Sequence, residues 1–253
     1  MTGETVKTRG IAISIRPMSR TSHVVTWLTP GAGAVPMAVK GAVRPKSAYL
    51  GQYDLFYTCG IVYYARPHGG LWLPREIWPE ERRDGLRGRW RETSLAAYAA
   101  DLAGELAPPG DGAADWFRLL SGFLDSLAER PAAMSPHESL LAMLRFERGA
   151  LKLAGLAPDL RHAAADGGWT SVAIDGGPPE RGRRVARIPA GAAAAIAGTA
   201  RDPSPADVRD AIRFFGAFIA YHLERRPSAR ESLVALLSSR PAHAPRAPSG
   251  AEC

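Results

Sequence analysis

The sequence predicts an α+β protein in which a small basic β-barrel precedes an all-helical domain. Apolar residues alternate along short runs in the first third of the chain, whereas after residue 79 they recur every three or four positions. A chain of 253 residues, 46% of them hydrophobic, is long enough for two such units. We therefore expect a barrel at residues 1–79, a helical domain at 80–240 and a disordered tail at 241–253.

Five candidate strands occupy the predicted barrel. Isoleucines alternate with small or polar residues at 11–16, and apolar residues alternate in the same way at 35–40. Apolar runs at 24–28, 55–64 and 71–73 supply three more strands, separated by turn-forming sequences such as TPGAG and ARPHGG. Short strands at this spacing favour a small closed barrel.

Helical signals dominate the second domain. Two amphipathic stripes follow residue 79, formed by Leu95, Tyr98, Leu102 and Leu106 and by Trp116, Leu120, Phe123 and Leu127. The next helix starts at Ser135, which is followed by Pro136 and Glu138 in a capping-box pattern, and it ends near Gly155. A late helix begins in a similar way at Ser204. Residues 158–189, rich in Gly, Pro and Arg, are expected to form an irregular subdomain, and the alanine-rich stretch at 190–197 is either compositional bias or a weak helix.

The charge of the chain is concentrated in its first third. The net charge is +7, and residues 1–79 hold nine basic and three acidic side chains, which gives them a net charge of +6. The rest of the chain is close to neutral. This distribution favours an acidic partner, either nucleic acid or an acidic protein tail, over a neutral small molecule.

The strongest candidate site is the basic turn KGAVRPKS at residues 40–47. It presents Lys40, Arg44 and Lys46 on one short segment, in which Gly41 permits a bend and Pro45 stiffens the backbone. Three cations held in this way can neutralise neighbouring phosphates.

An isolated run of three charges is more often a solvated turn than a binding site. Two further arginines, Arg16 and Arg20, and the scarcity of nearby acids favour a DNA-binding face. Among the aromatic residues of the barrel, Tyr49 and Tyr53 follow the basic turn and are candidates for stacking on bases. Other rings in apolar strands are expected in the core.

Motifs for catalysis and for membrane insertion are missing from the sequence. The glycine-rich stretch GAGAVPMAVKG lacks the GK[ST] ending of a phosphate-binding loop, and His137 and Glu138 lack the second histidine of a zinc-protease helix. Cys59 lies in an apolar run and is expected to be a buried thiol. We expect a soluble protein with no enzymatic activity, no cofactor and no membrane span.

With these residues in hand, the chain resembles the RecO family of bacterial recombination mediators over nearly its whole length. The matching stretches are RGIAISIR at 9–16, SHVVTWLT at 22–29, AVKGAVRPKS at 38–47, LRFERGALKLAGLAPDL at 144–160 and AYHLERRPSARESL at 220–233. The resemblance implies an N-terminal OB-fold and a helical C-terminal domain. It also implies binding of single- and double-stranded DNA, strand annealing, contact with the acidic C-terminal tail of single-strand binding protein, and partnership with RecR in loading RecA.

The chain departs from the family pattern where many members bind zinc. The first Cys pair of that site would fall on Ala163 and Asp166, and there is no cysteine between Cys59 and Cys253. His162 alone cannot provide four ligands, so we expect a degenerate zinc-finger-like insertion without metal. Two other departures are Met18 and Arg20, where the family commonly has an aromatic residue and an acid, and LGQYDLF at 50–56.

We therefore expect a cytoplasmic, nucleoid-associated recombination mediator that acts as a monomer and uses Arg16, Arg20, Lys40, Arg44, Lys46 and Tyr49 to bind DNA. Two alternatives remain. One is a protein-interaction adaptor whose helical domain receives an acidic peptide on Arg145, Arg148 and Lys152, and the other is a generic OB-fold DNA binder without annealing activity. A metal-free enzyme is a third and weaker reading, because no nucleophile and base can be assembled from the sequence.

Overall fold

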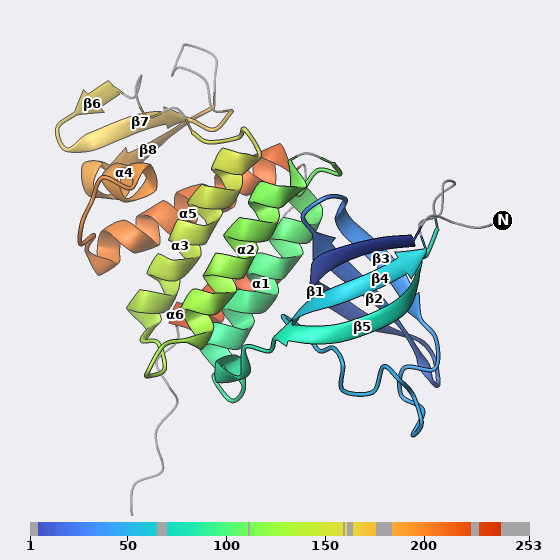
Figure 1. Cartoon of the computed structure of the whole chain (residues 1–253). Coiled ribbons are helices and arrows are strands. Elements are labelled where there is room, and N and C mark those ends of the chain that lie inside the picture. The colour runs from blue at the N-terminus through green and yellow to red at the C-terminus, as the bar shows by residue number, and fades with distance from the viewer. Residues whose placement is uncertain are drawn as a thin grey trace, which may run out of the picture.

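The computed structural model has the predicted order of an antiparallel sheet domain followed by helices (Figure 1). It describes residues 5–64, 70–110, 112–158, 160, 164–175, 184–223 and 228–238, so the predicted tail at 241–253 lies outside the described residues. Figure 1 shows the sheet domain on one side of a helical bundle and a small second sheet at the far end of the bundle. Among the helices in the described ranges, none is long and apolar enough to cross a membrane.

The first domain is a five-stranded antiparallel sheet that curls into an OB-fold-like barrel. Its strands are β1 (Thr5–Ser19), β2 (Ser22–Thr29), β3 (Gly33–Val39), β4 (Thr58–Tyr64) and β5 (Leu73–Glu81). Their order is β3-β2-β1-β4-β5, and the long β1 pairs with β4 through its first half and with β2 through its second. The two outer strands meet where Met37 forms a parallel bridge with Trp72 and the Ala38 amide donates to the Trp72 carbonyl over 2.8 Å. The five predicted strands are therefore all present.

Several strands differ from the predicted bounds. β1 has 15 residues, Thr5–Ser19, where the sequence predicts a strand at 11–16. β4 begins at Thr58 rather than at residue 55, because Phe56 adopts a left-handed backbone with φ 67° that interrupts regular pairing. β5 has nine residues and extends past the expected domain boundary at residue 79. Its Pro74 and Pro79, which suggest a loop in the sequence, lie beside register shifts in a strand at the end of the sheet order, where a missing N–H is tolerated.

Side chains from all five strands fill the barrel. Trp27, Met37 and Ile61 are fully buried in it. Cys59 is buried beside them, its thiol donates to the Gln52 carbonyl over 3.5 Å, and burial raises its pKa to about 12. The expectation of a buried thiol is confirmed.

The second domain packs its helices around a shared apolar core. After the short 3-10 helix η1 (Asp84–Leu86), its helices are α1 (Trp90–Leu106), α2 (Ala113–Ala128), α3 (Pro136–Leu153), α4 (Ala190–Ala197), α5 (Pro205–His222) and α6 (Ser228–Ser238). The predicted start signals are confirmed. The Ser135 hydroxyl accepts from the Glu138 amide over 3.2 Å while the Glu138 carboxylate accepts from the Ser135 amide over 2.8 Å, and Ser204 caps α5 in a similar way.

The segment expected to be irregular contains a sheet instead. β6 (Ala164–Asp166), β7 (Trp169–Ala173) and β8 (Val185–Pro189) form a three-stranded antiparallel sheet, and the alanine-rich stretch after it forms α4. Gly167 and Gly168, with φ 53° and 85°, supply the two positive φ angles of a type I′ hairpin turn between β6 and β7. The buried side chains of Val172 and Ile188 attach this sheet to the main helical core.

The barrel and the bundle share that core. Ile11, Ile13, Leu28 and Phe56 point out of the barrel and pack with buried residues of the helical domain. A side chain at Gly104 of α1 would collide with the Ile13 side chain, whose δ-carbon lies 2.8 Å from the ideal Cβ position. The two domains therefore meet through close packing, which positions the barrel surface relative to the helices.

Candidate nucleic-acid interface and peptide pocket

The basic turn at residues 40–47 is attached to the hairpin that joins β1 and β2. The Gly41 amide donates to the Ser22 hydroxyl over 3.1 Å, and the Val43 amide donates to the Thr21 carbonyl over 3.3 Å. Gly41 has φ 66°, a conformation that glycine adopts without strain, and the Arg44 amide donates back to its carbonyl over 3.1 Å. The turn is thus a defined structure.

Four of the predicted cations lie on these two connected turns. Lys40, Arg44 and Lys46 are exposed on the basic turn, and Arg20 is exposed in the adjoining β1–β2 hairpin. Within the described part of the chain, none of the four forms an ion pair, so their charges are available to a ligand. We refer to Arg20, Lys40, Arg44 and Lys46 as the basic turn cluster.

Arg16 lies apart from this cluster. It is exposed on β1 and pairs in register with Val24, on the part of the barrel that faces α1. Burial raises the pKa of Asp101 on α1, and the positive charge of Arg16 partly offsets that shift. The Asp101 carboxylate therefore balances part of the positive charge of Arg16 within the molecule.

The two tyrosines predicted to stack on bases are held against the barrel. Tyr49 packs on the barrel core and donates its hydroxyl to the Pro74 carbonyl over 2.9 Å, and burial raises its pKa. The Tyr53 hydroxyl lies 2.8 Å from His23 Nδ1, and its ring meets Trp27 edge-on with centroids 6.0 Å apart. Only the part of each ring that remains exposed is available to a base, and the stacking role of Tyr49 stays a prediction.

Exposed aliphatic side chains on the loop between β3 and β4 are not among the site residues predicted from the sequence. Val43, Leu50 and Leu55 are 45%, 53% and 41% exposed on the loop that also carries Lys40, Arg44 and Lys46. Apolar groups beside cations suit a ligand with both phosphates and flat bases.

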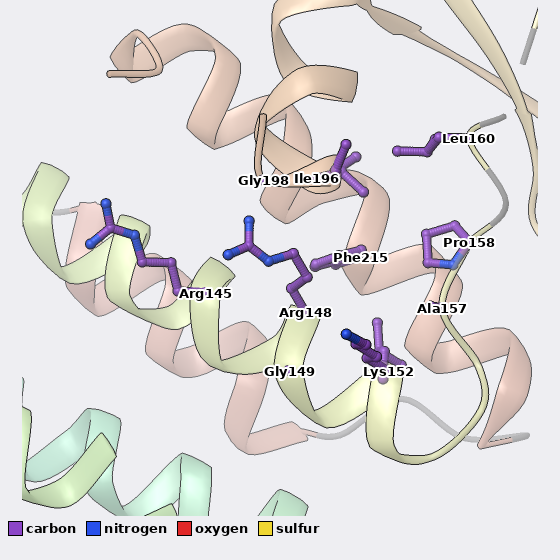
Figure 2. Close-up of a pocket in the computed structure, with 12 residues that line it drawn as sticks. Arg145, Arg148, Gly149, Lys152, Ala157, Pro158, Leu160, Ile196, Gly198 and Phe215 are labelled. Atoms are coloured by element: carbon purple, nitrogen blue, oxygen red, sulfur yellow. The ribbon is translucent and has the colours of Figure 1, made fainter. Parts of the chain in front are cut away.

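A second candidate site lies on α3, at the side chains that the adaptor alternative selected. Arg145, Arg148 and Lys152 project from one side of α3 toward the end of α4 and line a pocket of about 400 Å³ (Figure 2). Its remaining walls are largely apolar, and they include Leu160, Ile196 and Phe215. The guanidinium of Arg148 lies directly against Gly198, at a point where any side chain would collide with it. An apolar pocket with a cationic rim can receive an acidic peptide that ends in apolar side chains.

A third basic region, at residues 82–91, also escaped the sequence reasoning. The segment RRDGLRGRWR contains five arginines and one acid. This basic run is concealed when the net charge is averaged over the whole chain after residue 79. Arg83 is buried, and its guanidinium donates to the Phe56 carbonyl, Thr58, Glu81, Ser121 and Asp125 over 2.7–2.9 Å. It joins the barrel to α2, and its neighbours in the sequence remain at the surface.

The described residues do not form a metal centre. Within them, no group of three or more His, Cys, Asp or Glu side chains is placed to hold an ion. Of the positions where family members have zinc ligands, Ala163 and the nearby His162 lie outside the described residues, while Asp166 ends β6. The small sheet therefore occupies this part of the chain, and its attachment is through packing against the helices.

Comparisons with known proteins agree with this architecture. The family model described as "Recombination protein O N terminal" matches residues 1–73, and the one described as "Recombination protein O C terminal" matches residues 87–231. The chain is 28% identical to the DNA repair protein RecO of Anaeromyxobacter sp. (strain K) over 252 residues, which cover 90% of this chain and 95% of that protein. It is 27% identical to the RecO protein of Geobacter metallireducens over 65% of this chain and 64% of the relative. The chain, from its barrel to its last helix, belongs to the recombination protein O (RecO) family.

Proposed function

We propose that this protein is a DNA repair and recombination mediator that binds single- and double-stranded DNA and anneals complementary strands. The observation that carries the proposal is the basic turn cluster, in which four exposed cations without ion-pair partners in the described chain are fixed on two connected turns. Cations presented in this way release counterions from a phosphate backbone regardless of base sequence. The protein would therefore act at the nucleoid on DNA of any sequence.

Annealing follows from charge neutralisation. Two complementary strands repel each other, and a surface that neutralises several phosphates lowers the free energy needed to bring them together. No group that reacts chemically with DNA is required for this step, because base pairing supplies the driving force. The proposed activity is accordingly that of a mediator and not of an enzyme.

The pocket on α3 supports a second part of the proposal, contact with the acidic C-terminal tail of single-strand binding protein. Arg145, Arg148 and Lys152 would receive the carboxylates, and the apolar wall at Ile196 and Phe215 would receive apolar side chains of the tail. Through this contact a monomer could reach DNA that is already coated. Partnership with RecR and loading of RecA rest on family membership.

The salt dependence of DNA binding tests the role of the basic turn cluster. Changing Lys40, Arg44 and Lys46 together to Ala should weaken binding on all sequences and flatten the log-log salt slope by as much as ~3 units, about 0.9 for each lost phosphate contact. The matched control removes the same charge from the helical domain, by changing exposed Arg118, Arg201 and Arg213 to Ala. An unchanged slope in the first variant, or an equal change in the control, would remove the turn from the interface.

The adaptor alternative is favoured by one observation, the pocket on α3 itself. In that reading the helical domain performs the function and DNA contact is incidental. Capture of the acidic tail peptide with full affinity by the Lys40/Arg44/Lys46 variant, together with repair activity retained in cells, would support the adaptor over the mediator.

A further inference from the structure

The surface around Trp90, at the first turn of α1, has the features of a nucleic-acid contact. Trp90 is 44% exposed, although a tryptophan in a soluble protein is usually largely buried. The guanidinium of Arg91 lies over its ring, 4.2 Å from the centroid. The exposed remainder of the indole is a flat apolar surface beside a cation, which is the combination that stacks on an unpaired base.

The beginning of α1 is held in place by the connection between α2 and α3. The Glu92 carboxylate accepts from the Met134 amide over 2.7 Å, and Arg91 donates to the Met134 carbonyl over 3.4 Å. Arg89 donates to the carbonyl of Arg130 over 2.7 Å. Because the residues on both sides of Trp90 are anchored in this way, its ring is presented from a fixed backbone, which lowers the entropy cost of binding a ligand on it.

Two exposed arginines, Arg82 and Arg87, lie in the segment that leads from β5 into α1. Arg82 is exposed and has no ion-pair partner among the described residues. Arg87 is also exposed. It donates to Asp84 over 3.1 Å, and to Asp54 and the Tyr57 hydroxyl at the end of the β3–β4 loop over 2.9 and 2.8 Å. This surface therefore adjoins the β3–β4 loop, and in Figure 1 the start of α1 lies at the end of the bundle away from the small sheet.

We propose that Trp90, Arg82 and Arg87 form a second binding site, for single-stranded DNA, in which a base stacks on Trp90 and the arginines contact the flanking phosphates. This site rests on the function proposed above and deepens it, because a molecule that anneals DNA as a monomer must hold two strands at once. One strand would lie on the basic turn cluster and the other on the Trp90 site.

A protein partner would fit this surface less well than DNA. An apolar protein surface that covered Trp90 and the adjoining segment would also bury the guanidinium of Arg82, which has no ion-pair partner among the described residues, and burying an unpaired charge is costly. A DNA strand instead supplies an aromatic base and a phosphate within one nucleotide, so it matches the ring and the cations together.

The test is photo-crosslinking followed by annealing, on the full-length protein. An oligothymidine of about 10 nucleotides, within the ~4–16 bound by an OB-fold, carries 5-iododeoxyuridine, and the crosslinked peptides are mapped. We expect crosslinks to the peptide that contains Trp90. Trp90→Ala should lose these crosslinks and slow the annealing of bare complementary strands by at least about fivefold, the lower end of what one stacked base contributes, and Trp90→Phe should restore most of the rate.

Trp169 offers a matched control. It is 46% exposed on β7 with the Arg187 guanidinium 5.8 Å from its ring, so Trp169→Ala also removes an exposed tryptophan beside an arginine. That variant should anneal at the normal rate. Equal slowing by Trp169→Ala, or normal annealing by a folded Trp90→Ala protein, would overturn the proposal. It would also be overturned if Trp90→Ala lost binding to a protein partner while its DNA crosslinks at this peptide stayed unchanged.

Failure of this site and failure of the proposed function give different results. If the Lys40/Arg44/Lys46 variant binds DNA with an unchanged salt slope while Trp90 still crosslinks, the assignment of the basic turn cluster falls and the Trp90 site stands. If that variant loses the Trp90 crosslinks together with all DNA binding, Trp90 is not an independent second site and the inference fails.

Discussion

At the scale of single residues, the contact that a single substitution should disrupt most is a buried ion pair between Arg230 and Glu147. Arg230 donates to both carboxylate oxygens of Glu147 over 2.7 and 2.9 Å and to the Ile212 carbonyl over 2.9 Å. Tyr98 donates its hydroxyl to the same carboxylate over 2.6 Å, and burial together with the charge of Glu147 raises its pKa well above the usual value. These contacts join α1, α3, α5 and α6.

Removing one partner of this pair should destabilise the protein severely. Arg230→Met leaves the fully buried Glu147 without its counter-charge and should lower the free energy of unfolding by ~3–5 kcal/mol. The double variant Glu147→Leu/Arg230→Met leaves no buried charge, and urea unfolding should show it to be more stable than Arg230→Met alone. If the double variant were less stable than the single one, the loss of the ion pair itself, and not the unpaired buried charge, would account for most of the destabilisation.

Arg83 shows why such contacts could not be predicted from the sequence. It lies in a run of charges that is typical of a solvated surface, yet its side chain is 3% exposed. Its partners come from the β3–β4 loop, from β4 and β5, and from α2, so only the tertiary structure brings them together. Its own φ of 51° and that of Phe56 place two non-glycine residues in the left-handed region at this junction.

At the scale of elements, the sequence predicts the helix ends and turns that are set by contacts between neighbouring residues. The start of α3 was predictable because Ser135 and Glu138 satisfy each other's amides without help from the rest of the fold. β5 was underestimated because its prolines and glutamates oppose a strand, and pairing with β4 overrides that preference. The small sheet carried a readable signal in Asp166-Gly-Gly-Trp169, which places two glycines where a hairpin needs positive φ.

The cap of α3 makes stability depend on pH. Hydrogen bonds from the Ser135 backbone and side chain, and then the charge of Arg130, lower the pKa of Glu138. A carboxyl group with a lowered folded-state pKa stabilises the fold above its unfolded pKa of about 4.3, and that contribution is lost as the pH falls through the folded-state value.

Two substitutions test this cap. Ser135→Ala should cost ~1 kcal/mol at pH 7, whereas Ser135→Thr, which keeps the hydroxyl, should cost less. Glu138→Ala should destabilise at pH 7, and its effect should fade as the pH drops from ~4.3 through the lowered pKa of Glu138, because the wild-type carboxylate is then protonated and loses its charge-assisted contacts. Thermal unfolding measured from pH 3 to pH 7 checks both, and a Glu138→Ala penalty that does not vary with pH would contradict the account.

At the scale of the whole molecule, the two candidate surfaces lie on different parts of the fold. The basic turn cluster is on the barrel, whereas the pocket is formed by α3, the end of α4 and α5, on the side of the bundle near the small sheet (Figure 1). The proposed function would therefore allow one molecule to hold a peptide and DNA together. The sequence predicted the cations of both candidate sites, but the apolar wall of the pocket brings together Leu160, Ile196 and Phe215, which are distant in the sequence, and needed the structure.

The pocket predicts a separable defect. Reversing charge with Arg148→Glu and Lys152→Glu should raise the Kd for a labelled acidic-tail peptide at least about tenfold, because carboxylates would face carboxylates at the rim. Fluorescence anisotropy measures this, with Arg118→Glu/Arg213→Glu as the control for net charge. Bare-DNA affinity should change equally in the two variants, and tail affinity that also changes equally would remove the pocket from the interaction.

The most direct test of the mediator proposal is the rate at which the purified protein anneals complementary oligonucleotides coated with single-strand binding protein. We expect faster annealing with the intact coating protein and no acceleration when the acidic tail of that protein is deleted. Absence of acceleration on coated strands, despite salt-sensitive binding of bare DNA, would contradict the mediator function and leave a basic OB-fold DNA binder.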